Sequence, residues 1–203
     1  MLAVIDYGAG NLRSVLHALT YLGVESMRVI RSPHELRGAD KIILPGVGAF
    51  GAGMQRLREQ NLISAIKDAA YAGIPYLGIC LGMQFLFDYS DEMGHHEGLG
   101  LLPGFVTRLP EMPGCKIPHM GWNAIKPIRP SPLLKGLDGG YAYFVHSYYC
   151  VPLQTSDIIL QVDYGIEVTA AVQRDNLFGV QFHPEKSQRV GLKILANFLE
   201  IER

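Results

Sequence analysis

Residues 76–84 read YLGICLGMQ, and this stretch decides the fold. An apolar run ends at Cys80, and Gly78 and Gly82 lie two residues to either side. A cysteine between two such glycines has the form of a nucleophile elbow, a tight turn from a strand into a helix where neighbouring chains pack closely. The stretch therefore predicts an α/β sheet with a thiol at the end of one strand.

Around this corner, the first half of the chain alternates between strand and helix patterns. Apolar residues recur at helical spacing from Leu12 to Leu22, with Asn11 expected as the N-cap. This alternation predicts a mostly parallel central sheet flanked by helices on both faces. The expected strands are Leu2–Asp6, Glu25–Ile30, Lys41–Leu44 and Pro75–Ile79, and the further helices are Met54–Ala72, with a break near Asn61, and Leu81–Tyr89.

The second half is rich in strand patterns and is expected to add a largely antiparallel β portion. Asp175–Asn176 is a two-residue hairpin turn between two of these strands. The expected strands are Phe105–Leu109, Gly121–Lys126, Tyr141–Cys150, Ile158–Val162, Glu167–Arg174 and Leu177–Phe182, with a helix from about Ser187 and loops over Glu92–Gly104 and Pro110–Pro118. Because no linker or repeat interrupts the chain, we expect a single domain over residues 1–203.

Composition argues against several classes of function. A net charge of −1, with no Lys or Arg run, disfavours nucleic acid or an anionic membrane as the main partner. The N-terminal MLAVIDYGAG lacks the basic region of a signal peptide, and no apolar stretch is long enough to cross a bilayer. Three widely spaced cysteines do not suggest a disulfide framework, so we expect a cytoplasmic protein with reduced thiols.

Cys80 is the candidate nucleophile. At the start of the following helix, free N–H groups and the helix dipole favour the thiolate, which is the reactive form. The N–H of Leu81 is also placed to bind an oxyanion on an attacked carbonyl. The alternative is a buried structural cysteine, since free cysteines are among the most buried residues, so the catalytic interpretation requires a base.

His183 offers that base, because it follows a strand pattern and precedes the last helix. Open α/β sheets keep their sites at strand ends. Glu185, two residues on, can orient the imidazole, and Pro184 stiffens the link. Taken alone, a histidine is more often structural than catalytic, so this assignment depends on its pairing with Cys80.

A glycine-rich loop, PGVGAFG at residues 45–51, is the third element. Its glycine spacing matches the dinucleotide-binding fingerprint, but it follows the third strand rather than the first, and no acidic residue follows at the required distance. What remains is a loop whose backbone N–H groups can closely approach a ligand, which suits an oxyanion hole.

In this order, PGVGAF, GICLGMQ and GVQFHPEKS resemble the class I glutamine amidotransferase family, over essentially the whole chain. The resemblance implies a flavodoxin-like α/β fold and no cofactor. It implies that Cys80, His183 and Glu185 form a triad that hydrolyses L-glutamine through a γ-glutamyl thioester. The residues implied to form the oxyanion hole or to hold the glutamine are Gly46, Val47, Gly48, Leu81, Gln84, His146, Ser147 and Tyr148.

Four more segments, DYGAGNLRSV, EGLGLLPG, KIPHMGWN and YFVHSYY, resemble the glutaminase subunits of imidazole glycerol phosphate synthases in histidine biosynthesis. This implies a heterodimer with a (β/α)8-barrel cyclase subunit, which uses the ammonia to make imidazole glycerol phosphate and an aminoimidazole carboxamide ribotide. Asn11, Trp122 and Lys186 are implied to face that subunit. Taken alone, Trp122 is equally well a half-buried core aromatic, and Lys186 a solvated charge.

Two other functions stay open. A glutaminase that feeds pyridoxal phosphate synthesis belongs to the same class, although KIPHMGWN and YFVHSYY favour histidine biosynthesis. A non-catalytic α/β binding protein is the other, although the complete triad argues against it. His95, His96 and Glu97 lie too close in sequence for one metal site on one element, so no metal is expected. We also expect the isolated chain to be a poor glutaminase, if the Val47–Gly48 peptide points its carbonyl into the site at rest.

Overall fold

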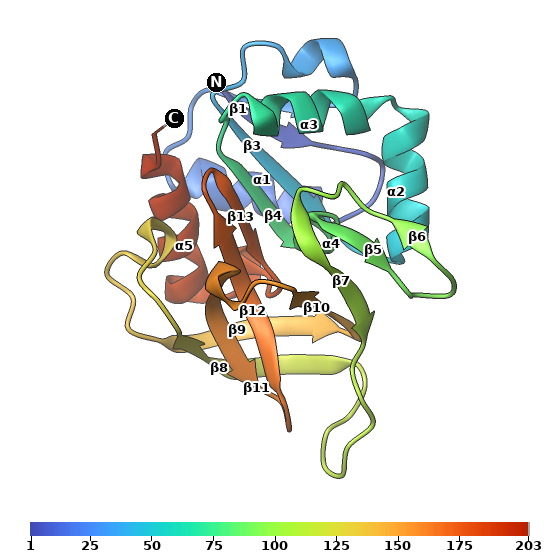
Figure 1. Ribbon diagram of the computed structural model, residues 1–203. Coiled ribbons are helices and arrows are strands. Elements are labelled where there is room, and N and C mark those ends of the chain that lie inside the picture. Colours follow the sequence, from blue (N-terminus) through green and yellow to red (C-terminus); the bar gives the residue numbers. More distant parts are fainter. Residues whose placement is uncertain (203) are drawn as a thin grey trace.

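The computed structural model describes residues 1–202, which form two β-sheets with helices packed against them (Figure 1). The helices are α1 (Leu12–Tyr21), α2 (Phe50–Glu59), α3 (Leu62–Tyr71), α4 (Leu81–Gln84) and α5 (Gln188–Glu200), with short 3₁₀ turns η1 (Pro33–Leu36), η2 (Pro132–Leu134), η3 (Thr155–Asp157) and η4 (Pro184–Lys186). The larger sheet contains, in spatial order, β2 (Met27–Ile30), β1 (Leu2–Ile5), β3 (Lys41–Gly46), β4 (Tyr76–Cys80), β13 (Leu177–Val180), β12 (Glu167–Arg174), β11 (Ile158–Asp163), β8 (His119–Pro127) and β9 (Gly140–His146). The smaller sheet contains β10 (Tyr148–Pro152), β7 (Leu102–Arg108), β5 (Phe87–Ser90) and β6 (His96–Glu97).

The parallel part of the large sheet runs from β2 to β13 and is covered on both faces. Successive side chains of a strand point to opposite faces. Leu77 and Ile79 of β4 therefore join the core cluster of α1 and α5, while Tyr76 joins the cluster of α2 and α3. Figure 1 shows the same layers, and the prediction of a mostly parallel sheet between helices is confirmed.

The predicted antiparallel portion is also confirmed, since β12, β11, β8 and β9 continue the same sheet in antiparallel order. The predicted hairpin turn joins β12 to β13, with Asp175 at a φ of +50°. Strands β4 and β13 are parallel neighbours, with Ile79 beside Val180. Their carboxyl ends therefore meet at one edge of the sheet, and Cys80 and His183 both follow there.

The elbow between β4 and α4 exists because its glycines have no side chains. A Cβ at Gly82 would overlap the carbonyl oxygen of Leu44 on β3, and one at Gly78 would overlap the backbone of Gly82. The Tyr76 hydroxyl donates a hydrogen bond to the Gly82 carbonyl at 2.9 Å, which fixes the helix start on the sheet. The α4 segment thus packs backbone against backbone, as the sequence predicts.

The predicted helix over Leu81–Tyr89 is wrong beyond its first turn. Helix α4 ends at Gln84, and residues 87–90 form β5. Phe85, Leu86 and Phe87 are all fully buried in succession, a pattern that one helix face cannot produce. Pairing of β5 with both β6 and β7 therefore overrides the local helical preference.

Two further boundaries differ from expectation. The single strand predicted over Tyr141–Cys150 breaks at Ser147, because β9 belongs to the large sheet and β10 to the small one. The loop predicted over Glu92–Gly104 contains β6 and the start of β7: both pair with β5, and β7 also pairs with β10, which lies far away in the sequence. Non-local pairing of this kind leaves little trace in the local pattern.

At the helix ends, one expectation holds and two need correction. The break predicted near Asn61 is confirmed, since Asn61 adopts a left-handed backbone between α2 and α3. Helix α2 begins at Phe50 rather than Met54, despite its glycines. Asn11 precedes α1 but does not cap it, because its Oδ1 accepts a hydrogen bond from the Ser14 hydroxyl at 2.9 Å instead of a backbone N–H.

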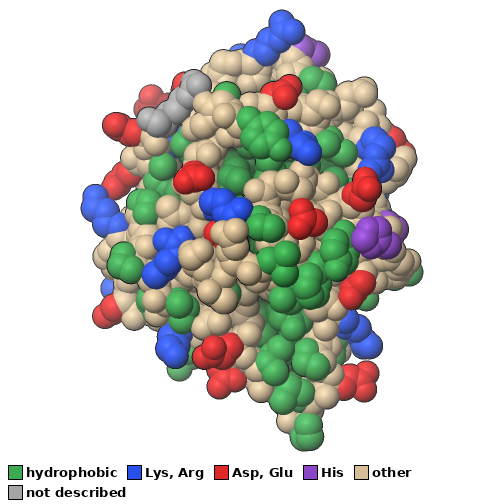
Figure 2. Space-filling view, viewed as in Figure 1, with side chains coloured by type: hydrophobic (Ala, Val, Ile, Leu, Met, Phe, Trp, Pro, Cys, Tyr) green, Lys and Arg blue, Asp and Glu red, His purple; other side chains and the backbone are tan. Residues whose placement is uncertain are grey.

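The surface carries charges of both signs. On the face shown in Figure 2, acidic and basic side chains are interspersed, and hydrophobic side chains form a band in its lower part. Among residues 1–202, no helix combines the length and the hydropathy that crossing a membrane requires.

We predict that Gly82→Ala lowers the free energy of unfolding by about 3 kcal/mol or more, because the new Cβ would overlap the Leu44 carbonyl. Gly73→Ala is the matched control. Its Cβ would meet nothing within 4 Å, so only the backbone strain at a φ of +81° should lower the free energy of unfolding, by about 1–2 kcal/mol. Urea denaturation of the two variants measures both losses. Equal losses would contradict the close packing of the elbow.

Candidate functional site

Cys80 occupies a strained corner at the end of β4. Its φ of 54° and ψ of −110° lie outside the regions that side-chain-bearing residues normally adopt. Such strain persists only where the surrounding structure enforces it, and it concentrates at functional sites. The residue is 6% exposed and directly precedes α4, so its thiol lies at the start of a helix, at the edge of a cavity.

His183 and Glu185 lie together on the segment that follows β13. His183 Nδ1 donates to Glu185 Oε1 at 2.8 Å, and both side chains are buried. The other ring nitrogen, Nε2, is buried without a hydrogen bond of good geometry. It is therefore the atom left to exchange a proton with the thiol or with a substrate.

The environment of His183 favours its protonated form. Burial alone lowers the pKa of His183, but interactions with the side chains of Cys80 and Glu185 outweigh burial and raise this pKa from 6.5 to about 10. An imidazolium is stabilised where two neighbours carry or accept negative charge. The arrangement thus holds a protonated imidazole beside the Cys80 sulfur at neutral pH.

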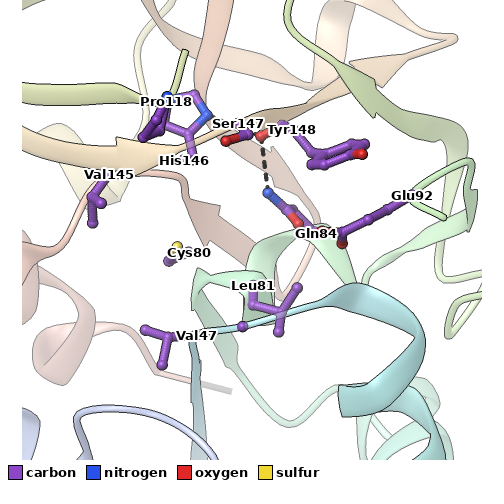
Figure 3. A pocket seen from close by; sticks show the side chains of 11 residues that line it. Val47, Cys80, Leu81, Gln84, Glu92, Pro118, Val145, His146, Ser147 and Tyr148 are labelled. Carbon is purple, nitrogen blue, oxygen red and sulfur yellow. Dashed lines mark hydrogen bonds between the residues drawn. The ribbon is translucent and has the colours of Figure 1, made fainter.

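A cavity of about 440 Å³ opens at Cys80, between the two sheets (Figure 3). Gln84 and Tyr148 approach each other across it, and the Gln84 amide donates to the Tyr148 carbonyl at 3.1 Å. Seven of the eight residues expected for oxyanion or glutamine binding line this cavity: Val47, Gly48, Leu81, Gln84, His146, Ser147 and Tyr148.

Gly46 is the exception, since it does not line the cavity. It lies in β3, directly beside Cys80 in the parallel ladder. A Cβ there would overlap the Tyr7 hydroxyl and meet the Cβ of Leu81 at 3.0 Å. Gly46 therefore brings β3 close to the elbow, and the loop that follows it, with Gly48 at a φ of +102°, faces the cavity.

Sequence reasoning missed two polar residues of the site. Glu92 lines the cavity, and its Oε2 accepts a hydrogen bond from the Phe50 N–H at the start of α2, at 2.7 Å. Gln181 is fully buried; its Nε2 lies 3.7 Å from Cys80 Sγ, and its Oε1 accepts from Gln84 at 3.1 Å. Gln181 stands two residues before His183 in GVQFHPEKS, a signal that could have revealed it, whereas Glu92 lay in a predicted loop.

The three residues expected at a partner face do not line the cavity. Trp122 packs edge-on against Tyr143, its cross-strand neighbour, at a centroid distance of 6.0 Å. The Lys186 ammonium lies 5.7 Å from the centre of the same tyrosine ring. Asn11 is half-buried at the start of α1, and α1 contacts η4, the turn that carries Lys186.

The histidines at residues 95 and 96 lie away from this cavity. The His95 ring packs on Tyr89 at 4.7 Å, and His96 lies against Gly51 of α2. Among the described residues, no group of three or more potential ligands is placed to hold a metal ion.

Fold and site together define a class: an α/β protein with a nucleophile elbow whose thiol shares a sheet edge with an imidazole and a carboxylate. A family model described as "Glutamine amidotransferase class-I" matches residues 3–201. The chain belongs to the class I glutamine amidotransferase family.

Relatives and solved structures agree with this membership. The chain is 51% identical to the "Imidazole glycerol phosphate synthase subunit HisH" of Moorella thermoacetica, and the match covers 100% of this chain and 95% of that relative. It is 48% identical to the subunit of the same name from Methanothermobacter thermautotrophicus, over 100% of both chains.

Among solved structures, a glutamine amidotransferase superposes with a TM-score of 0.78 at 19% identity, covering 98% of this chain and 97% of the other. PurLQS from Thermotoga maritima gives a TM-score of 0.74 at 24% identity, with coverage of 98% and 96%. At these identities the likeness concerns the fold.

We predict that Glu185→Gln lowers the pKa of His183. The amide keeps the shape of the carboxylate and an acceptor oxygen for Nδ1, but it removes the negative charge that favours the imidazolium. Titration of the His183 ring by NMR should show the pKa falling by about 1 unit or more. Glu97→Gln, in the exposed strand β6, is the control and should leave it unchanged. A His183 pKa unaffected by Glu185→Gln would refute the electrostatic pairing.

Proposed function

We propose that this protein is the glutaminase subunit of an imidazole glycerol phosphate synthase: it hydrolyses glutamine and delivers the ammonia to a cyclase subunit. The observation that carries this proposal is the strained Cys80 beside the His183–Glu185 pair, at the mouth of a cavity lined with polar groups. The names of the full-length relatives support the choice of this enzyme over other glutaminases.

In the proposed reaction, the Cys80 thiolate attacks the side-chain amide carbon of glutamine. The tetrahedral intermediate collapses, the C–N bond breaks, and the His183 imidazolium gives its proton to the departing ammonia. A γ-glutamyl thioester remains on Cys80. His183, now neutral, takes a proton from a water molecule that hydrolyses the thioester, which releases glutamate and restores the thiolate. Glu185 keeps the imidazole oriented throughout.

Two backbone N–H groups are proposed to hold the oxyanion of the intermediate. One belongs to Leu81, at the first turn of α4, where N–H groups have no partner within the helix. The other belongs to Gly48, in the loop between β3 and α2. Each such donor is typically worth a factor of about 10² to 10³ in rate.

The polar rim of the cavity fits the two charged ends of glutamine. Glu92 supplies a carboxylate for the α-ammonium group, and its bond to the Phe50 N–H fixes its position. The backbone of residues 146–148, together with Gln84, is proposed to hold the remaining polar atoms of the α-amino and carboxylate ends. The reactive amide then lies over Cys80.

A surface for the partner lies on strands β8 and β9. Met120, Trp122 and Tyr141 are 61%, 46% and 63% exposed, and alternation along the two paired strands places them on one face with Tyr143. Exposed aromatic and methionine side chains of this kind are enriched in protein interfaces. Val145, on the same face of β9, lines the cavity, so the surface leads directly to the site.

We propose that a (β/α)8-barrel cyclase subunit covers this surface, with Asn11, Trp122 and Lys186 in the heterodimer interface. The cyclase then uses the ammonia to convert a phosphoribulosyl-formimino intermediate into imidazole glycerol phosphate and an aminoimidazole carboxamide ribotide. We also propose that the two subunits work together in the cytoplasm.

Cys80→Ala should abolish glutamate release from glutamine in the assembled enzyme, because the γ-glutamyl thioester cannot form without the Cys80 sulfur. Cys115→Ala is the matched control: this half-buried cysteine packs near Gly165, away from the cavity, and its loss should leave turnover unchanged. Glutamate is measured with the cyclase subunit and its nucleotide ligand present. Glutamine turnover by Cys80→Ala at the wild-type rate would sink the proposal.

Glutamine turnover should rise at least about tenfold when the cyclase subunit and its ligand are added, as expected if they favour an active loop state that is rarely populated alone. The Gly48 backbone, in the left-handed region and outside any strand, marks where that loop can change. Equal turnover by the lone chain and the complex would contradict this.

The same assay tests the surface. Trp122→Glu should reduce the rise in glutamine turnover that the cyclase subunit causes, because aromatic anchors dominate interface energies and their loss lowers the affinity for the partner. Tyr71→Glu, which replaces an exposed aromatic on α3, should keep the full gain. A full gain in Trp122→Glu would place the partner elsewhere.

A further inference from the structure

His119 and His146 form a buried pair that the proposed chemistry does not use. They stand opposite each other on β8 and β9, and they are 2% and 6% exposed. His119 Nδ1 lies 3.0 Å from His146 Nε2, and His146 Nδ1 lies 2.9 Å from the Tyr148 carbonyl oxygen. His119 Nε2 lies 3.5 Å from the amide nitrogen of Asn123. All four ring nitrogens therefore have partners.

These partners allow only one direction of donation. A carbonyl oxygen only accepts, so His146 Nδ1 must carry the proton that it donates to Tyr148. In a neutral ring, His146 Nε2 then accepts, and His119 Nδ1 must donate to it. The Asn123 amide donates at the other end, because it also donates to the Asp163 carbonyl at 2.9 Å while its Oδ1 accepts from the Ala124 N–H.

Both rings are held in the neutral state. Burial lowers the pKa of His119 to about 4 and that of His146 to about 3. Neither ring is therefore suited to proton transfer at neutral pH. Two neutral rings with fixed tautomers can instead orient the group that accepts the last hydrogen bond, the Tyr148 carbonyl.

Ring packing fixes the position of His119. Its ring stacks on Phe144 at 4.7 Å and on Tyr164 at 3.9 Å, with interplanar angles of 16° and 24°. The Tyr164 hydroxyl is itself bound to the Lys116 carbonyl at 2.7 Å. His119 is therefore a rigid donor rather than a mobile side chain.

The last acceptor, the Tyr148 carbonyl, lies where the chain crosses from the large sheet to the small one. Tyr148 pairs with Arg108 of β7, and the Leu109 N–H bonds to the Ser147 carbonyl, so Tyr148 and Arg108 form a non-hydrogen-bonded pair. The ladder with β7 thus leaves the Tyr148 carbonyl free. Side chains hold it instead, through His146 Nδ1 and Gln84 Nε2.

We propose that His119 is a positioning residue for the glutamine site: by donating to His146, it fixes the backbone carbonyl of Tyr148, a residue that lines the cavity. This inference rests on the proposed function, since it assigns the backbone at Tyr148 to glutamine binding. His119 touches no reacting atom, so its loss should weaken the binding of glutamine more than it slows the chemical step.

Two substitutions separate the donor from the ring. His119→Phe keeps the stacking on Phe144 and Tyr164 but cannot donate, whereas His119→Asn loses the stacking but keeps an N–H near the position of Nδ1. In the complex with the cyclase subunit, His119→Phe should raise the KM for glutamine about tenfold, the effect of losing about one hydrogen bond, and change kcat less than about threefold. His119→Asn should keep KM within about threefold of the wild type, even if its Tm is lower.

A wild-type KM in His119→Phe, or an equal rise in both variants, would overturn the proposal, because the donor would then not matter. A second measurement needs neither activity nor a variant that folds. Ring ¹⁵N shifts of the labelled wild-type chain should show His146 neutral with its proton on Nδ1, and a proton on Nε2 would also overturn the proposal. Absence of glutamine turnover by the wild-type complex would instead refute the proposed function. The ring shifts would still decide whether His119 donates to His146.

Discussion

The left-handed backbone of Cys80 is the constraint on which the site depends. A side-chain-bearing residue adopts a φ of 54° only when its neighbours leave no alternative, and here the neighbours are backbone atoms. Gly82 lies against the carbonyl of Leu44, and Gly78 lies against the backbone of Gly82. With α4 pressed onto β3 and β4 in this way, the thiol has one position, at the helix start and the cavity edge.

The histidines around the site show how the local environment sets the protonation state of one type of side chain. His183 has Glu185 on one side and Cys80 on the other, so its pKa is raised and it holds a proton. His119 and His146 have only neutral partners in a buried setting, so their pKa values are lowered and they stay neutral. Rings of opposite protonation state thus lie on the large sheet and on the segment that follows β13.

The junction of the two sheets explains why the cavity exists. Strand β9 ends at His146 and β10 starts at Tyr148, so the chain leaves one sheet and joins the other within two residues. The large sheet carries Cys80 and the His183 segment, and the small sheet carries the Tyr148 side of the cavity. Gln84 ties the two together, through the Tyr148 carbonyl and Gln181. A ligand in this cavity therefore contacts both sheets.

Local sequence predicted the parts of the molecule that depend on local rules. The strand–helix alternation, the hairpin at Asp175–Asn176 and the break at Asn61 follow from periodicity and turn chemistry, and the elbow follows from two glycines around a cysteine. The family resemblance also predicted a place in the site for residues that do line the cavity: Val47, Gly48, Leu81, Gln84 and residues 146–148.

Long-range contacts decided the rest. Helix α4 stops after one turn because residues 87–90 pair with strands that follow them in the chain, and no local pattern encodes those partners. Glu92 joins the cavity because the Phe50 N–H, 42 residues away, holds its carboxylate. His119 meets His146 only through the β8–β9 register. The sequence alone indicated which residues are candidates for the chemistry, and the tertiary structure decided how most of the cavity is arranged, because Gln84, Glu92 and His119 are held by hydrogen bonds to residues distant in the chain.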